Sequence, residues 1–242
     1  MNAIEITDLT KRYGDTLAVD GLSLFVECGE LFSLLGVNGA GKTTTIKMLS
    51  CLTQATSGDA LLLGKSISRD AIQVKSLIAV SPQESALSRT LTVRENLRLM
   101  CGVHGFSREK SEQKISELSA LLSLDSVMDK RAGKLSGGWQ RRVSIAMALV
   151  SEPEILFLDE PTLGLDVLAR AELWDIIRGL RGRVTVVLTT HYMEEADALS
   201  DRVAIMKDGK LLVCDTPQGI KAMADTDSFE TAFIRIVKGV EK

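Results

Sequence analysis

A glycine-rich turn at Gly36–Thr43 limits the folds available to this chain more than any other segment. It reads G-x-x-x-x-G-K-T and lies between the apolar run Leu31–Leu35 and the helix-like stretch Thr44–Leu49. The backbone N–H groups of such a loop can wrap a phosphate chain, and the positive end of the following helix points at the same place. The spacing therefore predicts a strand, a phosphate-binding loop and a helix, in that order.

The residue types in this loop suit that use. Gly36, Gly39 and Gly41 permit backbone angles and close approaches that a Cβ would block, Lys42 brings a positive charge to the terminal phosphates, and the Thr43 hydroxyl can bind Mg²⁺. The alternative is an ordinary strand-to-helix turn. Because the four specified positions coincide by accident in such a chain on the order of one time in a hundred, the phosphate site is favoured.

Size and composition exclude several classes of protein. The 242 residues suffice for one large α/β domain or two small ones. Interspersed charges sum to −3, so neither nucleic acid nor an anionic membrane surface is expected as a direct partner. No apolar run approaches the roughly 20 residues of a membrane helix and the start lacks a signal-peptide layout, so we expect a soluble chain. Four widely spaced cysteines are expected to be reduced core thiols, without disulfide or zinc: Cys28, Cys51, Cys101 and Cys214.

Apolar patterning predicts an α/β fold class with a mostly parallel sheet. The alternating runs of residues 2–29 indicate an N-terminal antiparallel β subdomain. Ile155–Leu158 and Val184–Leu188 are continuous apolar runs, which are typical of parallel strands covered on both faces. Residues 84–150 have helical periodicity and a capping-box pattern at Thr92–Glu95, and they are predicted to form a helical insertion.

The remaining elements complete a main domain of residues 1–220 and a short helical tail of residues 221–242. Val167–Leu180 is predicted to be a helix with Asp166 as its N-cap, and residues 202–215 form a predicted hairpin around Asp208-Gly209.

Asp159 and Glu160 follow directly on one of the predicted buried strands. In extended geometry their side chains diverge, so Asp159 can hold Mg²⁺ through a coordinated water while Glu160 takes a proton from an attacking water. The alternative, a solvated or capping pair of carboxylates, loses weight because a phosphate loop precedes the pair in the chain.

Three further groups lie at predicted strand ends or a helix start. His191 follows the second buried run, from where it could reach a γ-phosphate, although a lone histidine is more often structural. Gln83 offers a neutral oxygen for Mg²⁺ or water, although many such glutamines have no specific role. Ser136-Gly137-Gly138 can present N–H groups to an anion or be a plain glycine-bearing N-cap. One ATP needs only one phosphate loop, so this second helix start suggests a second ligand or the ligand of a partner subunit.

Taken together, these residues resemble the ATP-binding cassette (ABC) ATPases along nearly the whole chain. The resemblance assigns Gly36–Thr43 to the Walker A loop, Gln83 to the Q-loop, Leu135–Gln140 to the signature sequence, Ile155–Glu160 to Walker B, Leu163–Asp166 to the D-loop, His191 to the switch histidine and Tyr13 to the ring that stacks on adenine. The signature is the most discriminating of these, because P-loop proteins in general lack it. Trp139 in the signature, Val37 in the loop and Val167 after the D-loop depart from the family's usual residues without replacing a catalytic group.

The resemblance implies a P-loop NTPase core that works as a head-to-tail homodimer or heterodimer of ATPase domains. It implies catalytic roles for Glu160 and His191, Mg²⁺ at Thr43, Gln83 and Asp159, and contact of Ser136, Gly137, Gly138 and Gln140 with the ATP of the partner subunit, with Asp166 in the D-loop. ATP itself would be bound by Tyr13, Gly36, Val37, Asn38, Gly39, Ala40, Gly41, Lys42, Thr43 and Thr44.

The sequence around the motifs, at Leu91–Leu97 and Thr190–Leu199, resembles that of the stand-alone ATPases of ABC-2-type exporters. This implies separate transmembrane permease subunits as partners, no nucleic acid, and a cytoplasmic location on the inner face of the membrane, reached only through those partners. Two alternatives stay open. A non-transport ABC ATPase of translation or DNA repair would have a second cassette or a long coiled coil, and a P-loop kinase or GTPase would have no role for Ser136–Gly138.

Overall fold

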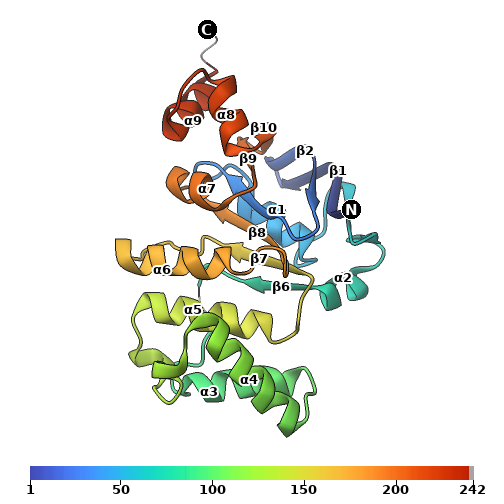
Figure 1. The fold of residues 1–242 in the computed structure, drawn as a ribbon. Coiled ribbons are helices and arrows are strands. Elements are labelled where there is room, and N and C mark those ends of the chain that lie inside the picture. The colour runs from blue at the N-terminus through green and yellow to red at the C-terminus, as the bar shows by residue number, and fades with distance from the viewer. Residues whose placement is uncertain (85, 240–242) are drawn as a thin grey trace.

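The computed structural model describes residues 1–84 and 86–239, which form two sheets with helices around them (Figure 1). The N-terminal sheet is antiparallel and has the strand order β2-β1-β4-β5. This confirms the antiparallel β subdomain predicted from residues 2–29. Its strands are β1 (Asn2–Tyr13), β2 (Thr16–Glu27), β4 (Ser57–Leu62) and β5 (Lys65–Ser66).

The second sheet has six strands in the order β10-β9-β3-β8-β7-β6. All neighbouring pairs are parallel except β9 and β10, which form the predicted hairpin. Every residue of β3, β7 and β8 is buried, which explains why these strands are continuously apolar or small in sequence. The strands are β3 (Leu31–Leu35), β6 (Ile78–Ser81), β7 (Ile155–Asp159), β8 (Thr185–Thr190), β9 (Arg202–Lys207) and β10 (Lys210–Asp215).

Helices cover the parallel sheet and extend beyond it at both ends. In Figure 1, α3, α4 and α5 lie together at one end of the molecule, within the segment predicted to be helical, and α8 and α9 lie at the opposite end. The helices are α1 (Lys42–Leu49), α2 (Ala71–Leu77), α3 (Val93–Val103), α4 (Arg108–Leu122), α5 (Gly137–Leu149), α6 (Val167–Arg178), α7 (Met193–Leu199), α8 (Pro217–Met223) and α9 (Phe229–Lys238). Within residues 1–84 and 86–239, every helix is too short or too polar to span a bilayer.

Helix starts follow the capping signals in the sequence. Thr92 and Glu95 form the predicted reciprocal capping box at the start of α3, where the Thr92 hydroxyl accepts a hydrogen bond from Glu95 N and the Glu95 carboxylate accepts one from Thr92 N. Asp166 caps α6 as predicted, because its Oδ1 accepts a hydrogen bond from Ala169 N at 2.9 Å. These caps satisfy N–H groups that the helices themselves leave unpaired.

The apolar core consists of three clusters. One packs α3–α6 against the parallel sheet, and a second fills the space between the two sheets around α1. The third joins Phe229 and Phe233 of α9 to Val203 and Ile205 of β9, with Ile220 of α8 among them. Full burial of side chains of this size stabilises a fold by about 1.5–3 kcal/mol each. The tail helix therefore packs on the main sheet, and the boundary predicted at residue 220 falls inside α8.

The expectation that all four cysteines are core thiols is wrong. Only Cys101 is buried, Cys51 and Cys214 are partly buried, and Cys28 is exposed in the turn before β3. The four cysteines are far apart in the sequence, so no periodic pattern indicated which of their side chains are buried.

Candidate active site

The carboxyl ends of three adjacent parallel strands bring the predicted site residues together. Leu35 at the end of β3 pairs with Thr190 of β8, and Asp159 at the end of β7 pairs with Thr189 of β8. The glycine-rich loop, the acidic pair and His191 each follow one of these strands. They therefore meet at one edge of the sheet, which is where open α/β sheets hold ligands.

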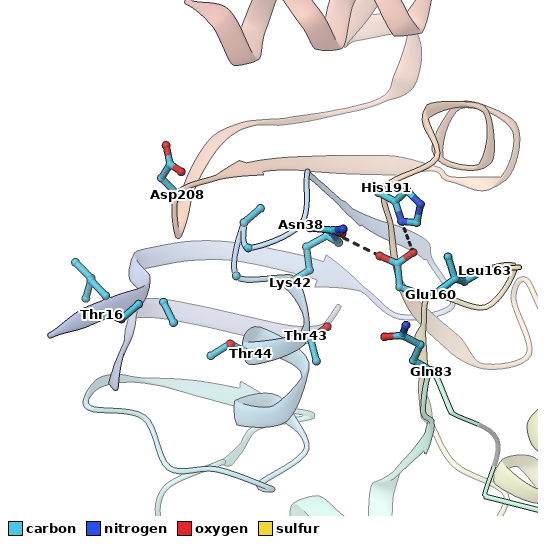
Figure 2. Close-up of a pocket in the computed structure, with 15 residues that line it drawn as sticks. Thr16, Asn38, Lys42, Thr43, Thr44, Gln83, Glu160, Leu163, His191 and Asp208 are labelled. Carbon is cyan, nitrogen blue, oxygen red and sulfur yellow. Dashed lines mark hydrogen bonds and ion pairs between the residues drawn. The ribbon is translucent and has the colours of Figure 1, made fainter. Parts of the chain in front are cut away.

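A cavity of about 700 Å³ opens at this edge (Figure 2). Its floor is the loop and the first turn of α1, and Gln83, Glu160 and His191 face it from the ends of β6, β7 and β8. The complete lining is Thr16, Leu17, Ala18, Asn38, Gly39, Ala40, Gly41, Lys42, Thr43, Thr44, Gln83, Glu160, Leu163, His191 and Asp208.

Gly41 shows why this loop needs glycine. It has φ 102° and precedes α1, and a Cβ there would lie 2.5 Å from the Ala18 carbonyl oxygen of β2. A side chain would collide with the backbone of the N-terminal sheet, so glycine lets the loop lie against β2. Residues of that sheet thereby become part of the cavity wall.

Lys42 is the buried cation of the cavity. Its Nζ donates hydrogen bonds to the carbonyl oxygens of Gly36 at 2.7 Å and Val37 at 3.3 Å, and lies 3.5 Å from Glu160 Oε1. Both side chains of this ion pair are less than a tenth exposed. The carbonyls of the loop thus bind the lysine of the same loop, which can exchange these neutral partners for the oxygens of an anion.

Asp159 and Glu160 serve different partners, as predicted, but the backbone reason is different. Asp159 Oδ1 accepts hydrogen bonds from the hydroxyls of Thr43 at 3.2 Å and Thr189 at 2.5 Å. Glu160 is not extended: its φ is 49°, and its N–H donates to Thr189. This left-handed turn at the strand end directs Asp159 toward the start of α1 and Glu160 toward Lys42 and His191.

His191 completes the cluster at the mouth of the cavity. Its Nδ1 lies 2.8 Å from Glu160 Oε2, so Glu160 contacts Lys42 through one oxygen and His191 through the other, as the dashed lines in Figure 2 show. The ring of Tyr192 packs at 4.2 Å between centroids from that of His191. The histidine thus acts on the acidic group in this structure, whereas the sequence suggested a direct approach to phosphate.

Several predicted residues lie outside the cavity lining. Gly36 and Val37 contribute carbonyls to Lys42, and Asp159 stands behind Thr43. Tyr13 is about half exposed with Lys11 Nζ 4.8 Å above its ring, and the described lining residues from its sheet are Thr16, Leu17 and Ala18.

The signature residues lie at the start of α5, beside α6 and away from the lining. Ser136 and Gly137 are exposed, and Gly138 packs so closely on Ala169 of α6 that a Cβ would lie 3.0 Å from the Ala169 Cβ. Gln140 uses its amide within the chain, donating to Leu135 O at 2.9 Å. Trp139 is partly buried under the Arg142 guanidinium, 4.5 Å from the ring centroid. Asp166 is occupied as the α6 cap.

Sequence reasoning missed residues whose role depends on strand neighbours. Thr189 holds both Asp159 and Glu160, and Asp208, in the turn of the β9–β10 hairpin, is among the residues that line the cavity. Thr189 is two residues before His191 at a predicted strand end, which is the one local signal that pointed to it. Arg141, described further below, had no such signal.

A phosphate loop closed by a buried lysine, with two carboxylates and a histidine at neighbouring strand ends, defines a P-loop nucleotide-binding protein. A family model described as "ABC transporter" matches residues 19–163. The chain belongs to this family.

Relatives and solved structures agree with that assignment. The chain is 39% identical over 245 residues to the "Probable multidrug ABC transporter ATP-binding protein YbhF" of Escherichia coli, covering 99% of this chain and 42% of that protein. It is 40% identical over 218 residues to the "Nod factor export ATP-binding protein I" of Burkholderia orbicola, covering 90% and 72%. The structure of cbiO1 from Clostridium perfringens, part of the cbiONQ transporter complex, superposes with a TM-score of 0.85 at 25% identity, covering 91% of each chain. These names give no support to the translation or DNA-repair alternative.

Proposed function

We propose that this chain binds and hydrolyses ATP as the ATP-binding subunit of an ABC-2-type exporter. In this proposal two ATPase domains, identical or different, close on two MgATP and thereby move separate membrane subunits. The observation that carries it is the convergence of the buried Lys42 and Glu160 with the partly exposed His191 at the mouth of the phosphate-loop cavity. A bare phosphate-binding protein would have no need of a general base at that position.

Two residues of the cavity lining, Thr43 and Gln83, and Asp159 behind Thr43 fit a magnesium ion. Thr43, Gln83 and Asp159 offer hydroxyl, amide and carboxylate oxygens, which are the donors that Mg²⁺ prefers. When bound, Mg²⁺ neutralises charge on the phosphate oxygens.

The protein side chains supply binding and proton transfer. Triphosphate oxygens replace the Gly36 and Val37 carbonyls as partners of Lys42, and the loop N–H groups hold them in place. Glu160, freed from Lys42, accepts the proton of the attacking water, a role worth about 10²–10⁴-fold in rate. His191 holds the second oxygen of that carboxylate and so fixes its direction toward the water.

The exposed signature supports the dimer. Ser136 and Gly137 are exposed at a helix N-terminus, outside the lining of the cavity in their own chain. In the proposed pair they complete the partner's site and Tyr13 stacks on adenine. Because the Gln140 amide is already bonded to Leu135, we assign it to holding the signature turn that contacts the partner's nucleotide.

The names of the relatives support export, and the proposed function implies a location. Multidrug and Nod factor export are activities named for proteins about 40% identical to this chain. The subunit would lie in the cytoplasm, attached to the membrane through its permease partners and without a nucleic-acid ligand.

Glu160→Gln tests the proposal. The variant keeps the shape of the side chain but loses the base, so it should bind ATP with a Kd within twofold of the wild type, accumulate as a nucleotide-bound dimer, and lose at least 10²-fold in kcat. Glu109→Gln, an exposed residue of α4, is the matched control. ATP turnover in Glu160→Gln equal to that of the control would remove Glu160 as the base, and a wild type that does not bind ATP would refute the whole assignment.

A further inference from the structure

Arg141 of α5 is a buried cation with an unusual set of partners. It is 5% exposed, and its guanidinium donates hydrogen bonds to four backbone carbonyls from two other segments. These are the carbonyls of Pro82, Gln83 (3.3 Å), Asp159 (2.5 Å) and Pro161 (2.9 Å). A planar guanidinium with several fixed donors can hold such a set at one geometry.

Arg141 keeps its positive charge although it is buried. Burial lowers the pKa of Arg141 to about 10, and the negative charges of Asp159, Glu195 and Glu160 act in the opposite direction. The group is therefore still charged at neutral pH. A buried charge of this kind is tolerated when it is well hydrogen-bonded, and the four carbonyls give each of the three guanidinium nitrogens at least one acceptor.

The four carbonyls belong to the two segments that carry the proposed chemistry. Pro82 and Gln83 form an exposed stretch after β6, and Asp159 and Pro161 flank Glu160 on either side. One guanidinium thus bridges the backbone of Gln83 to the backbone that sets the left-handed turn at Glu160. Arg141 lies on α5, the helix that begins with the signature residues, and is five positions after Ser136.

We propose that Arg141 is a positioning residue for ATP hydrolysis. It fixes the Gln83 segment relative to Asp159 and Glu160 and ties both to the helix that starts at Ser136. This inference rests on the proposed ATPase function but makes a claim of its own about backbone placement. Without Arg141 the exposed Gln83 segment moves away from the cavity, and misplacement on the order of 1 Å costs on the order of 10²-fold in rate.

Arg142 provides a matched control on the same helix. It is also buried, at 7% exposed, but it pairs with Glu172 of α6 and stacks on Trp139. The change to Met removes a guanidinium of the same size and burial at each position. Arg142→Met should therefore destabilise the fold while leaving kcat within threefold of the wild type.

The experiment compares Arg141→Met, Arg141→Lys and Arg142→Met in the full chain. For Arg141→Met we expect kcat to fall 30- to 300-fold and the Kd for ATP to stay within threefold. Amide hydrogen exchange should rise at Gln83 and Glu84 and at Asp159, Glu160 and Thr162, while that of residues 36–43 should not; Pro82 and Pro161 have no amide hydrogen. Arg141→Lys keeps the charge without the planar fork and guards against loss of folding in the Met variant. It should lose at least tenfold in kcat with the same exchange pattern.

The outcomes separate the two claims. If both Arg141 variants fold and keep kcat within threefold of Arg142→Met, or if exchange at Gln83 and Glu84 is unchanged, the positioning role is wrong. If the wild type binds ATP but does not hydrolyse it, the proposed function fails, and the exchange pattern alone decides whether Arg141 places the Gln83 segment.

Discussion

Two glycines of the same loop should respond differently to one added methyl group. Gly39 has φ 84° and open space around the position of a Cβ, whereas Gly41 has φ 102° and the Ala18 carbonyl oxygen only 2.5 Å from that position. Gly39→Ala therefore adds backbone strain alone. Gly41→Ala adds strain and a collision with β2.

The magnitudes follow from these contacts. Left-handed backbone costs an L-residue roughly 1–2 kcal/mol, so we expect Gly39→Ala to lower the free energy of unfolding by about 1 kcal/mol. At Gly41 the strain is roughly 1–3 kcal/mol, and forcing an atom into a packed site costs roughly 1–3 kcal/mol more. Ala18 lies at a register shift of β2, and the paired residues on either side of it, Leu17 and Val19, limit how far its carbonyl can move. Gly41→Ala should therefore cost about 2–6 kcal/mol.

Urea unfolding of the nucleotide-free protein, followed by circular dichroism, measures both values. Omitting nucleotide matters, because ligand binding would add its own stabilisation to the wild type and obscure the difference. Equal midpoints for the two variants would refute the reasoning, since it attributes the difference to the Ala18 carbonyl. A Gly41→Ala protein as stable as the wild type would refute it more directly.

Two other perturbations follow from buried and capping groups. Burial raises the pKa of Glu195 above its ordinary value, so the folded state binds more protons than the unfolded state. The contribution of Glu195 to the free energy of unfolding therefore falls as pH rises. The fall begins at the pKa of the unfolded state, about 4.3, and continues through the raised pKa of the folded state. Glu195→Gln, which keeps an acceptor for Trp174 Nε1, should gain stability relative to the wild type between pH 5 and pH 8 in thermal melts; a pH-independent difference would contradict this. Thr92→Ala removes the capping box of α3 and should lower the free energy of unfolding in urea by about 1 kcal/mol. Thr231→Ala in α9 is the control and should cause no measurable change, because Thr231 contacts the Ser228 cap only through its backbone N–H. A Thr92→Ala midpoint equal to that of the wild type would show that α3 is held by packing alone.

Local features of this protein were predictable from the sequence because they depend on neighbours a few residues away. The phosphate loop requires glycines at fixed spacing, the capping box joins Thr92 to Glu95, and the cap of α6 joins Asp166 to Ala169. Continuous apolar runs identified buried parallel strands for the same reason, since both faces of each strand are covered. The position of Glu160 and His191 at strand ends could be read in the same way.

Tertiary structure decided which of these residues meet and with what backbone geometry. The strand order places β8 between β3 and β7, so Thr189 bonds both the Asp159 carboxylate and the Glu160 N–H. Glu160 there has φ 49°, away from the extended form that its strand suggested. The same order brings Arg141 to carbonyls 59, 58, 20 and 18 residues away in the chain. It also leaves Tyr13 outside the cavity lining. The physical reason is that the hydrogen bonds and ion pairs of this site cross between strands and helices, and a periodicity within one segment carries no information about which segment lies beside it.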